Sequence, residues 1–448
     1  MHKFLLPVLF CALFWQQAIA QKDTSMNFSL KQAVEYAKSN SYQIKNARLD
    51  EVNAKSKVKE TLAGGLPQVN GSLSFNNNFQ LTPFYFNMNI PGFPVSKDPT
   101  RAGAKITGNG NINASQLLFD GSYLVGLQAS KEFVKLSQQI SQKTEQEIEI
   151  NVSKSYYMSL TVEENIQLLK GNLTQLEKTL SDTRALFKNG FVEKTDLDRL
   201  ELAVSELNLQ IEKLFNTHET AIRMLKMQMG IPMSQTIYLT DKLEDLYSSF
   251  ASLTEKNTPN PSNRIEYQLI NQQIRLNELN MKRYRVGFLP TFSAVYNFSE
   301  NSFRGSNFKP LTNDGWYSSS FLGVSMSLPL FDGFRKQAWM QQTRVELDKL
   351  DNNKKNFENA VALETYQAQA NYETALKQVT IRKNNLQLAK NIHSTVSTKF
   401  KNGVGSSFEL GQAESDLKTA QSNYLNSIYD LMVARIELNK ALGKPVLN

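Results

Sequence analysis

One short sequence occurs twice in this 448-residue chain and constrains its fold more than any other feature. It reads Phe187-Lys188-Asn189-Gly190 in the first half and Phe400-Lys401-Asn402-Gly403 in the second. Asn-Gly turns a chain sharply, because both residues adopt positive φ at low steric cost. Long helical patterns run into and out of both copies, so each copy predicts the bend of a helical hairpin. The chain is therefore predicted to be an internal duplication.

The start of the chain is predicted to be a secretory signal peptide, over residues 1–20. An apolar run at residues 5–15 precedes Ala18-Ile19-Ala20, which has the small residues of a cleavage site. That run is shorter than a typical membrane-spanning helix. The one cysteine, Cys11, lies inside it, so we expect no disulfide, no cysteine metal site and no lipid anchor in the mature chain.

Charge and composition argue against nucleic-acid binding and catalysis. Lys and Arg number 50 against 42 for Asp and Glu, but the two signs are interleaved along the helical patterns, as expected for solvated helix faces. Outside the signal peptide the histidines are His218 and His393, which lie far apart without a metal or triad pattern. We expect no enzyme activity, no catalytic residues, no metal site, no cofactor and no nucleic-acid partner.

The first structural repeat is predicted at residues 21–232. Its expected elements are helices at 29–39 and 42–62, a β-hairpin at 67–119 and a long helical hairpin at 121–229. Asp120 is a suitable N-cap for the first long helix, which at the usual rise per residue would extend roughly 100 Å. A linker or equatorial segment is predicted at residues 233–262.

The second repeat, at residues 263–448, has the same order of elements. They are a helix near 264–285, a β-hairpin at 290–331 and a long helical hairpin at 333–442. Matching boundary sequences mark both repeats: Leu66-Pro67 and Leu289-Pro290 before the strands, Phe119-Asp120-Gly121 and Phe331-Asp332-Gly333 after them, and Gly230-Ile231-Pro232 and Gly443-Lys444-Pro445 at the ends. We expect Asp332 to cap its helix as Asp120 does.

The four predicted strands alternate apolar residues with small polar residues. Val69, Leu73 and Phe75 alternate with Asn70, Ser72 and Ser74, for example. Lipid-facing and lumen-facing residues of a membrane barrel alternate in this way. A soluble sheet with one buried face is the alternative, but the remaining sequence predicts long hairpins rather than a covering layer. Four strands cannot close a barrel, so several chains would share one and the protein would be a homo-oligomer.

The order, spacing and duplication of these boundary sequences resemble the TolC-like outer membrane efflux family over essentially the whole mature chain. The resemblance implies a mixed, mainly α fold, in which three chains form a twelve-stranded outer membrane barrel on a periplasmic α-helical tunnel. It implies export of small molecules such as drugs or toxic compounds. The implied partners are a second and third copy, outer membrane lipid, a periplasmic adapter (membrane fusion) protein, and an inner-membrane pump of RND, ABC or MFS type.

Two other functions stay open at this stage. One is the outlet of a type I protein secretion system, which uses the same architecture. The other is a soluble periplasmic coiled-coil adapter protein, in which the strands would form a small separate domain. A segment rich in proline and aromatic residues, at about 81–101, is expected to be an extracellular loop.

The resemblance also implies roles for particular residues. The turns at residues 187–190 and 400–403 would contact the adapter. Asp196 and Glu409, each six residues after a turn glycine, would line the tunnel entrance, where a ring of carboxylates favours cations. The other explanation for both is that acidic residues stabilise helix starts. Gln412 would belong to the same gate, but it stands where the family can have a second aspartate. Gly405 stands where the family can have an arginine, so a softer, less cation-selective gate is expected.

Overall fold

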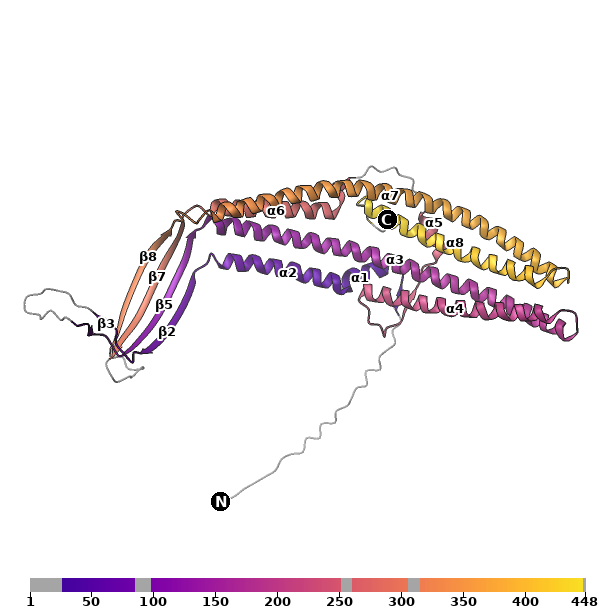
Figure 1. Ribbon diagram of the computed structural model, residues 1–448, viewed down its shortest axis with the longest axis horizontal. Coiled ribbons are helices and arrows are strands. Elements are labelled where there is room, and N and C mark those ends of the chain that lie inside the picture. The colour runs from indigo at the N-terminus through magenta and orange to yellow at the C-terminus, as the bar shows by residue number, and fades with distance from the viewer. Residues whose placement is uncertain (1–25, 85–97, 251–259, 305–314, 446–448) are drawn as a thin grey trace, which may run out of the picture.

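The computed structural model describes residues 26–84, 98–250, 260–304 and 315–445. The predicted signal peptide, Cys11 and most of the segment at 81–101 lie outside these residues. The molecule is elongated: a β-sheet lies at one end, two long helical hairpins reach the opposite end, and shorter helices fill the space between (Figure 1). This separation follows from the sequence, because each repeat holds one strand pair and one long hairpin.

The main sheet contains four antiparallel strands, two from each repeat. They are β2 (Gln68–Asn77), β5 (Ile106–Phe119), β7 (Thr291–Arg304) and β8 (Trp316–Ser327), in the spatial order β2-β5-β7-β8. The two repeats therefore meet at the β5–β7 pair, and β2 and β8 form the edges. A short second ladder pairs β3 (Pro83–Phe84) with β4 (Thr100–Arg101).

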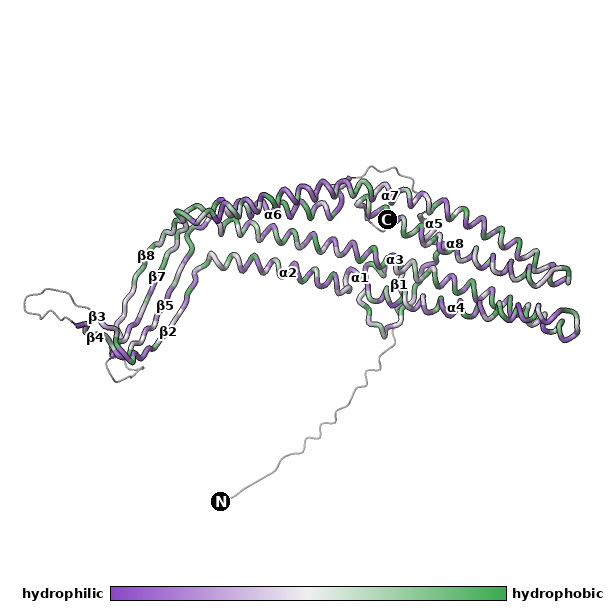
Figure 2. The backbone as a smooth tube through the Cα atoms, viewed as in Figure 1, coloured by the Kyte–Doolittle hydropathy of each residue, from purple (hydrophilic) through white to green (hydrophobic). Residues whose placement is uncertain are grey.

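The two faces of this sheet differ in character, as the alternation predicts, and hydrophobic and hydrophilic residues follow one another along the strands (Figure 2). We call the two sides the apolar face and the polar face. The apolar face carries Val69, Leu73, Phe75, Ile112, Ala114, Phe292, Ala294, Tyr296, Phe298, Trp316, Leu322, Val324 and Met326. It also carries Glu300, Ser302 and Arg304 at the end of β7 and Ser318 and Ser320 near the start of β8. The polar face carries Gln68, Asn70, Ser72, Ser74, Asn76, Thr107, Asn109, Asn111, Asn113, Ser115, Leu117, Thr291, Ser293, Val295, Asn297, Ser299, Asn301, Phe303, Tyr317, Ser319, Phe321, Gly323, Ser325 and Ser327.

Gly108 on the apolar face is required by the packing of aromatic rings across the strands. A Cβ at this position would lie 2.9 Å from the Trp316 ring and 3.1 Å from the Phe75 ring. Those two rings meet edge to face, with centroids 6.2 Å apart. Aromatic residues of this kind form the girdles of outer membrane barrels.

Each repeat contributes one very long helix with shorter helices packed along it. In the first repeat, α2 (Tyr42–Ala63) and α4 (Lys194–Met229) lie one after the other beside α3 (Gly121–Lys188), which has 68 residues. In the second repeat, α6 (Ile265–Val286) and α8 (Ser407–Ala441) lie in the same way beside α7 (Arg335–Lys401), while α6 and α8 also contact α3. Within the described residues, no helix combines the length and apolarity required to cross a membrane.

The main core lies where the two repeats meet, halfway along the molecule. It includes the fully buried Tyr156 and Tyr157 of α3, with side chains from α1 (Leu30–Asn40), α4 and α8. The Tyr156 hydroxyl donates to the Phe28 carbonyl over 2.9 Å and lies 3.0 Å from the Asp241 carboxylate. This core ties the N-terminal segment to the segment between the repeats.

The segment between the repeats, predicted as a linker, contains its own structure. β6 (Ile237–Leu239) pairs in parallel with β1 (Met26–Phe28), and it is followed by α5 (Leu243–Phe250) and a 3-10 turn, η1 (Pro261–Asn263). Ile237 and Leu243 are buried in the main core. The segment is therefore packed against both repeats rather than merely connecting them.

The caps of the two long helices differ from each other. Asp120 caps α3 as predicted, because its carboxylate accepts the N–H groups of Ser122 (2.7 Å) and Tyr123 (3.2 Å). The expectation that Asp332 is the N-cap of α7 is wrong. The N-cap residue is Phe334, which has a φ of 63°. Asp332 still accepts the N–H of Lys336 over 3.3 Å, so it satisfies one donor of the first turn from outside the helix.

Candidate functional site

The turn of the first hairpin has a glycine-dependent geometry. Gly190 adopts φ of 78°, and its N–H donates to the Phe187 carbonyl over 2.9 Å. The N–H of Phe191 donates to the Leu186 carbonyl over 3.0 Å. These two bonds form a Schellman motif, which satisfies the last carbonyls of α3 and requires a left-handed residue at the glycine position.

The turn of the second hairpin repeats this geometry bond for bond. Gly403 adopts φ of 70°, and its N–H donates to the Phe400 carbonyl over 3.0 Å. The N–H of Val404 donates to the Lys399 carbonyl, also over 3.0 Å. The repeated sequence therefore produces two copies of one backbone shape, both at the end of the molecule farthest from the sheet (Figure 1).

The most exposed apolar side chains at the turns directly follow the glycines. Phe191 is 76% exposed and Val404 is 77% exposed. The two phenylalanines of the repeated sequence behave differently, because Phe187 is 38% exposed whereas Phe400 packs against the apolar cluster of Leu200 and Leu410. Sequence reasoning missed Phe191 and Val404, although their equivalent places after the glycines would have indicated them.

The two hairpin ends are joined within one chain by a polar contact. The hydroxyl of the buried Ser407, at the start of α8, donates to the carboxylate of Asp196, at the start of α4. Arg199 lies 3.5 Å from the same hydroxyl and stacks over the Phe408 ring. We call Asp196, Arg199 and Ser407 the tip contact.

A cleft runs between the two ends beside this contact. It has a volume of about 1030 Å³, and both turn glycines, Phe400 and Asp196 line it. The turns and the expected gate residue Asp196 therefore lie at one place. Sequence reasoning missed Ser407 and Arg199, since a contact between two helix starts so far apart in the chain leaves no local pattern.

The other two expected gate residues lie on the outside of the chain. Glu409 is exposed in the first turn of α8, and its backbone N–H donates to the Ser406 hydroxyl over 3.1 Å. Gln412 is also exposed, and its amide donates to Asp416 over 2.9 Å. Asp416 lies seven residues after Glu409, so helical periodicity places these three side chains along one stripe of α8. Asp416 thus gives the stripe a second carboxylate, one helical turn beyond Gln412, where the family can have an aspartate.

The two histidines have opposite environments. His393 of α7 lies 2.7 Å from the Glu414 carboxylate of α8, and this hydrogen bond raises the pKa of His393. Burial lowers the pKa of His218 on α4, with a smaller opposing effect from Glu163. The Nε2 atom of His218 is buried and has no hydrogen-bond partner among the described residues. Neither environment is a metal or triad arrangement.

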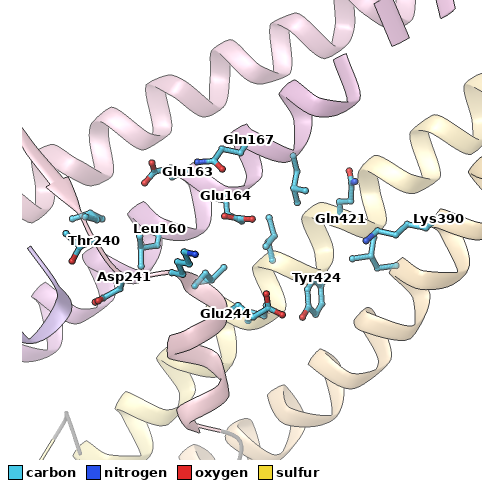
Figure 3. Close-up of a pocket in the computed structure, with 17 residues that line it drawn as sticks. Leu160, Glu163, Glu164, Gln167, Thr240, Asp241, Glu244, Lys390, Gln421 and Tyr424 are labelled. Atoms are coloured by element: carbon cyan, nitrogen blue, oxygen red, sulfur yellow. The ribbon is translucent and has the colours of Figure 1, made fainter. Parts of the chain in front are cut away.

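A second cleft lies near the middle of the molecule, between α3, α8 and α5 (Figure 3). Its volume is about 640 Å³, and Glu163, Glu164, Glu244 and Lys390 line it together with the Tyr424 ring. Burial raises the pKa of Tyr424. Because α5 belongs to the segment between the repeats, this cleft marks the seam along which that segment packs on the hairpins.

Comparison with known proteins identifies the family. The sequence matches the family described as outer membrane efflux protein over residues 33–230 and 268–444, which span most of both repeats. The chain belongs to the outer membrane efflux protein family. The resemblance inferred from the boundary sequences is thereby confirmed. This efflux protein is a channel component of the outer membrane with a periplasmic extension, and it is not an enzyme.

Individual relatives of this efflux protein agree with the assignment. The outer membrane protein TolC of Vibrio cholerae serotype O1 is 21% identical over 438 residues, covering 93% of this chain and 90% of that protein. The CusC channel superposes with a TM-score of 0.73 at 18% identity, covering 93% of this chain and 92% of CusC. The CmeC channel of Campylobacter jejuni gives a TM-score of 0.70 at 18% identity, covering 92% of this chain and 85% of CmeC. The predicted fold class is confirmed.

Proposed function

We propose that three copies of this chain close one barrel in the outer membrane and form the exit duct of a pump. The observation that carries this proposal is the four-stranded sheet with one apolar face and two edge strands, β2 and β8. Unpaired edges cannot remain in lipid, whereas three such sheets joined edge to edge give a closed barrel of twelve strands. The apolar face then contacts lipid and the polar face lines the lumen.

The duct is proposed to export small molecules such as drugs or toxic compounds, working with a periplasmic adapter protein and an inner-membrane pump of RND, ABC or MFS type. The efflux description of the family supports this reading. A type I protein secretion outlet is the second candidate, because the same tunnel would serve it. A soluble adapter is disfavoured by the exposed apolar face of the sheet, where Leu322 is 78% exposed.

The adapter is proposed to bind the hairpin ends. The contact would include the turns Phe187, Lys188, Asn189, Gly190 and Phe400, Lys401, Asn402, Gly403, as expected from the sequence. The Schellman geometry supports this role, since it leaves a narrow turn free of bulky side chains at each glycine. Phe191 and Val404 supply the exposed apolar anchors that protein interfaces need.

The tunnel entrance is proposed to be controlled near the same ends. The tip contact would hold the two hairpins of one chain together, so that the Asp196 carboxylate joins the hairpins rather than facing the lumen. Glu409, Gln412 and Asp416 would form the stripe of α8 that faces the lumen. In a trimer this stripe gives three copies of each carboxylate, and rings of carboxylates favour cations.

Export by living cells tests the function. A strain lacking the protein should become sensitive to toxic small molecules, and the wild-type gene should restore resistance. The double variant Phe191→Asp and Val404→Asp should fail to restore it although it still assembles in the outer membrane. Normal resistance with this double variant would refute the adapter contact. If the strain lacking the protein stops secreting a protein but keeps its resistance, the secretion outlet would be favoured.

Ion selectivity in a planar lipid bilayer tests the entrance. Glu409→Gln should shift the reversal potential under a salt gradient away from cation preference. Glu177→Gln is the matched control, because Glu177 is also exposed on a long helix but lies away from the turn. Equal shifts in both variants would contradict a lumen position for Glu409.

A further inference from the structure

Amide side chains pair across the strands on the polar face of the sheet. The Asn109 amide donates to the Asn301 side-chain oxygen over 2.6 Å, and the Asn297 amide donates to that of Asn111 over 3.0 Å. Both pairs join β5 to β7, the strands at which the two repeats meet. The Asn301 amide also donates to the Ser299 hydroxyl over 3.3 Å, and each of the four amides still keeps at least one N–H and one oxygen lone pair for another partner.

Aromatic rings stand on the same face beside these pairs. Tyr317 lies directly across from Asn301 and is 63% exposed, while Phe321 lies directly across from Asn297 and is 59% exposed. The rings of Phe303 and Tyr317 have centroids 6.4 Å apart, which places both on one side of the sheet. Exposed aromatic rings among small polar residues offer apolar faces that a solute at this wall can contact.

We call these residues the amide–aromatic patch: Asn109, Asn111, Asn297, Asn301, Tyr317 and Phe321. The patch belongs to the polar face, on which every residue of the four strands is uncharged and most carry an amide or a hydroxyl group. All four strands lie within the described residues. A solute at this wall therefore meets hydrogen-bonding groups and ring faces, and it meets no fixed charge of either sign.

We infer that the amide–aromatic patch binds uncharged, polyhydroxylated ring compounds, that is, saccharides or glycosides, on the lumen wall of the barrel. A hydroxyl group both donates and accepts, and so does a free amide edge, so the two match without an ion pair. The C–H faces of a sugar ring are apolar and pack against an aromatic ring, while the hydroxyl rim stays hydrated. The inference rests on the proposed duct, because the patch lines a lumen only when three sheets close.

Current recordings test this binding with maltohexaose, a neutral linear saccharide, as the probe. Purified trimers in a planar bilayer should show transient current reductions when maltohexaose is added, from which an apparent binding constant follows. Phe321→Ala should lower that constant by about tenfold, in line with the loss of one ring contact. Leu322→Ala is the matched control, because Leu322 is the next residue on the same strand but points from the apolar face. It should leave the constant unchanged.

The outcomes separate the binding site from the duct. Open channels that maltohexaose does not block would overturn the patch while leaving the duct intact. Single chains in place of trimers would overturn the duct itself. Block that is insensitive to Phe321→Ala, or equally sensitive to Leu322→Ala, would also overturn the patch. If Phe321→Ala does not assemble, Tyr317→Ala is measured in its place and judged by the same criterion.

Discussion

Ser407→Ala should loosen the contact between the two hairpin ends. The Ser407 hydroxyl is the donor to the Asp196 carboxylate, and Ser407 itself is buried. Hydrogen bonds to charged groups contribute about 1.5–3 kcal/mol. Asp196 is only half buried, so water partly replaces the lost donor and the lower end of that range applies. A loss of about 1.5 kcal/mol corresponds to roughly a tenfold increase in the open population.

Limited proteolysis measures this population. Lys401 is exposed in the turn next to the contact, and trypsin cleaves there when the end of the hairpin opens. When opening is fast relative to cleavage, the cleavage rate follows the population of the open form. Cleavage at the turn should therefore be about tenfold faster in Ser407→Ala than in the wild type. Ser415→Ala, an exposed serine further along α8, is the control.

A double-mutant cycle then tests whether the two residues act together. Asp196→Asn alone should raise the cleavage rate, and adding Ser407→Ala should raise it little further, because the shared bond is already weakened. Fully additive effects would show that the two side chains do not depend on each other. An unchanged rate of tryptic cleavage in Ser407→Ala would show that the tip contact does not hold the hairpin ends together.

Three further perturbations have definite expected results. The hydrogen bond with Glu414 raises the pKa of His393, so the pair stabilises the second hairpin fully below the ordinary pKa of 6.5 and loses this effect as pH rises through the raised pKa. His393→Ala should therefore increase proteolysis of α7 strongly at about pH 6 but little at about pH 9. An equal increase at both pH values would contradict this. Gly230→Ala should abolish assembly, because Gly230 has φ of 74° and a Cβ there would lie 2.5 Å from the Asn40 carbonyl oxygen; normal yield of trimer in detergent would show that this backbone can move. Gly171→Ala should instead stabilise α3 by about 0.5–1 kcal/mol, because a Cβ at this position meets open space. Proteolysis of α3 should then be slower. Faster proteolysis would indicate a neighbouring group that requires the glycine.

Repetition and periodicity made much of the fold predictable from the sequence. Apolar residues that recur at intervals of three, four or seven residues along α4 and α8 are buried, at Leu200, Leu207 and Ile211 and again at Leu410 and Leu417. The strands alternate over ten residues or more, so their faces are unambiguous. Local patterns of this length leave few alternatives.

Short or distant interactions could not be predicted in the same way. β1 and β6 have three residues each, too few to show alternation, and the helices and strands of the first repeat separate them in the chain. Phe334 adopts a positive φ that is rare for an aromatic residue, which moved the start of α7 away from Asp332. The resemblance places Asp196 at the tunnel entrance, and its hydrogen bond with Ser407 could not be predicted because Ser407 belongs to the other repeat.

The number of chains in the assembled protein tests whether three copies share one barrel. We would extract the outer membrane fraction in mild detergent and measure the mass of the purified protein, with and without heating. We expect a particle of three chains that separates into single chains on heating, because the sheet edges of β2 and β8 are satisfied only by neighbouring copies. A single chain that stays soluble without detergent would contradict the shared barrel, and with it the proposed duct.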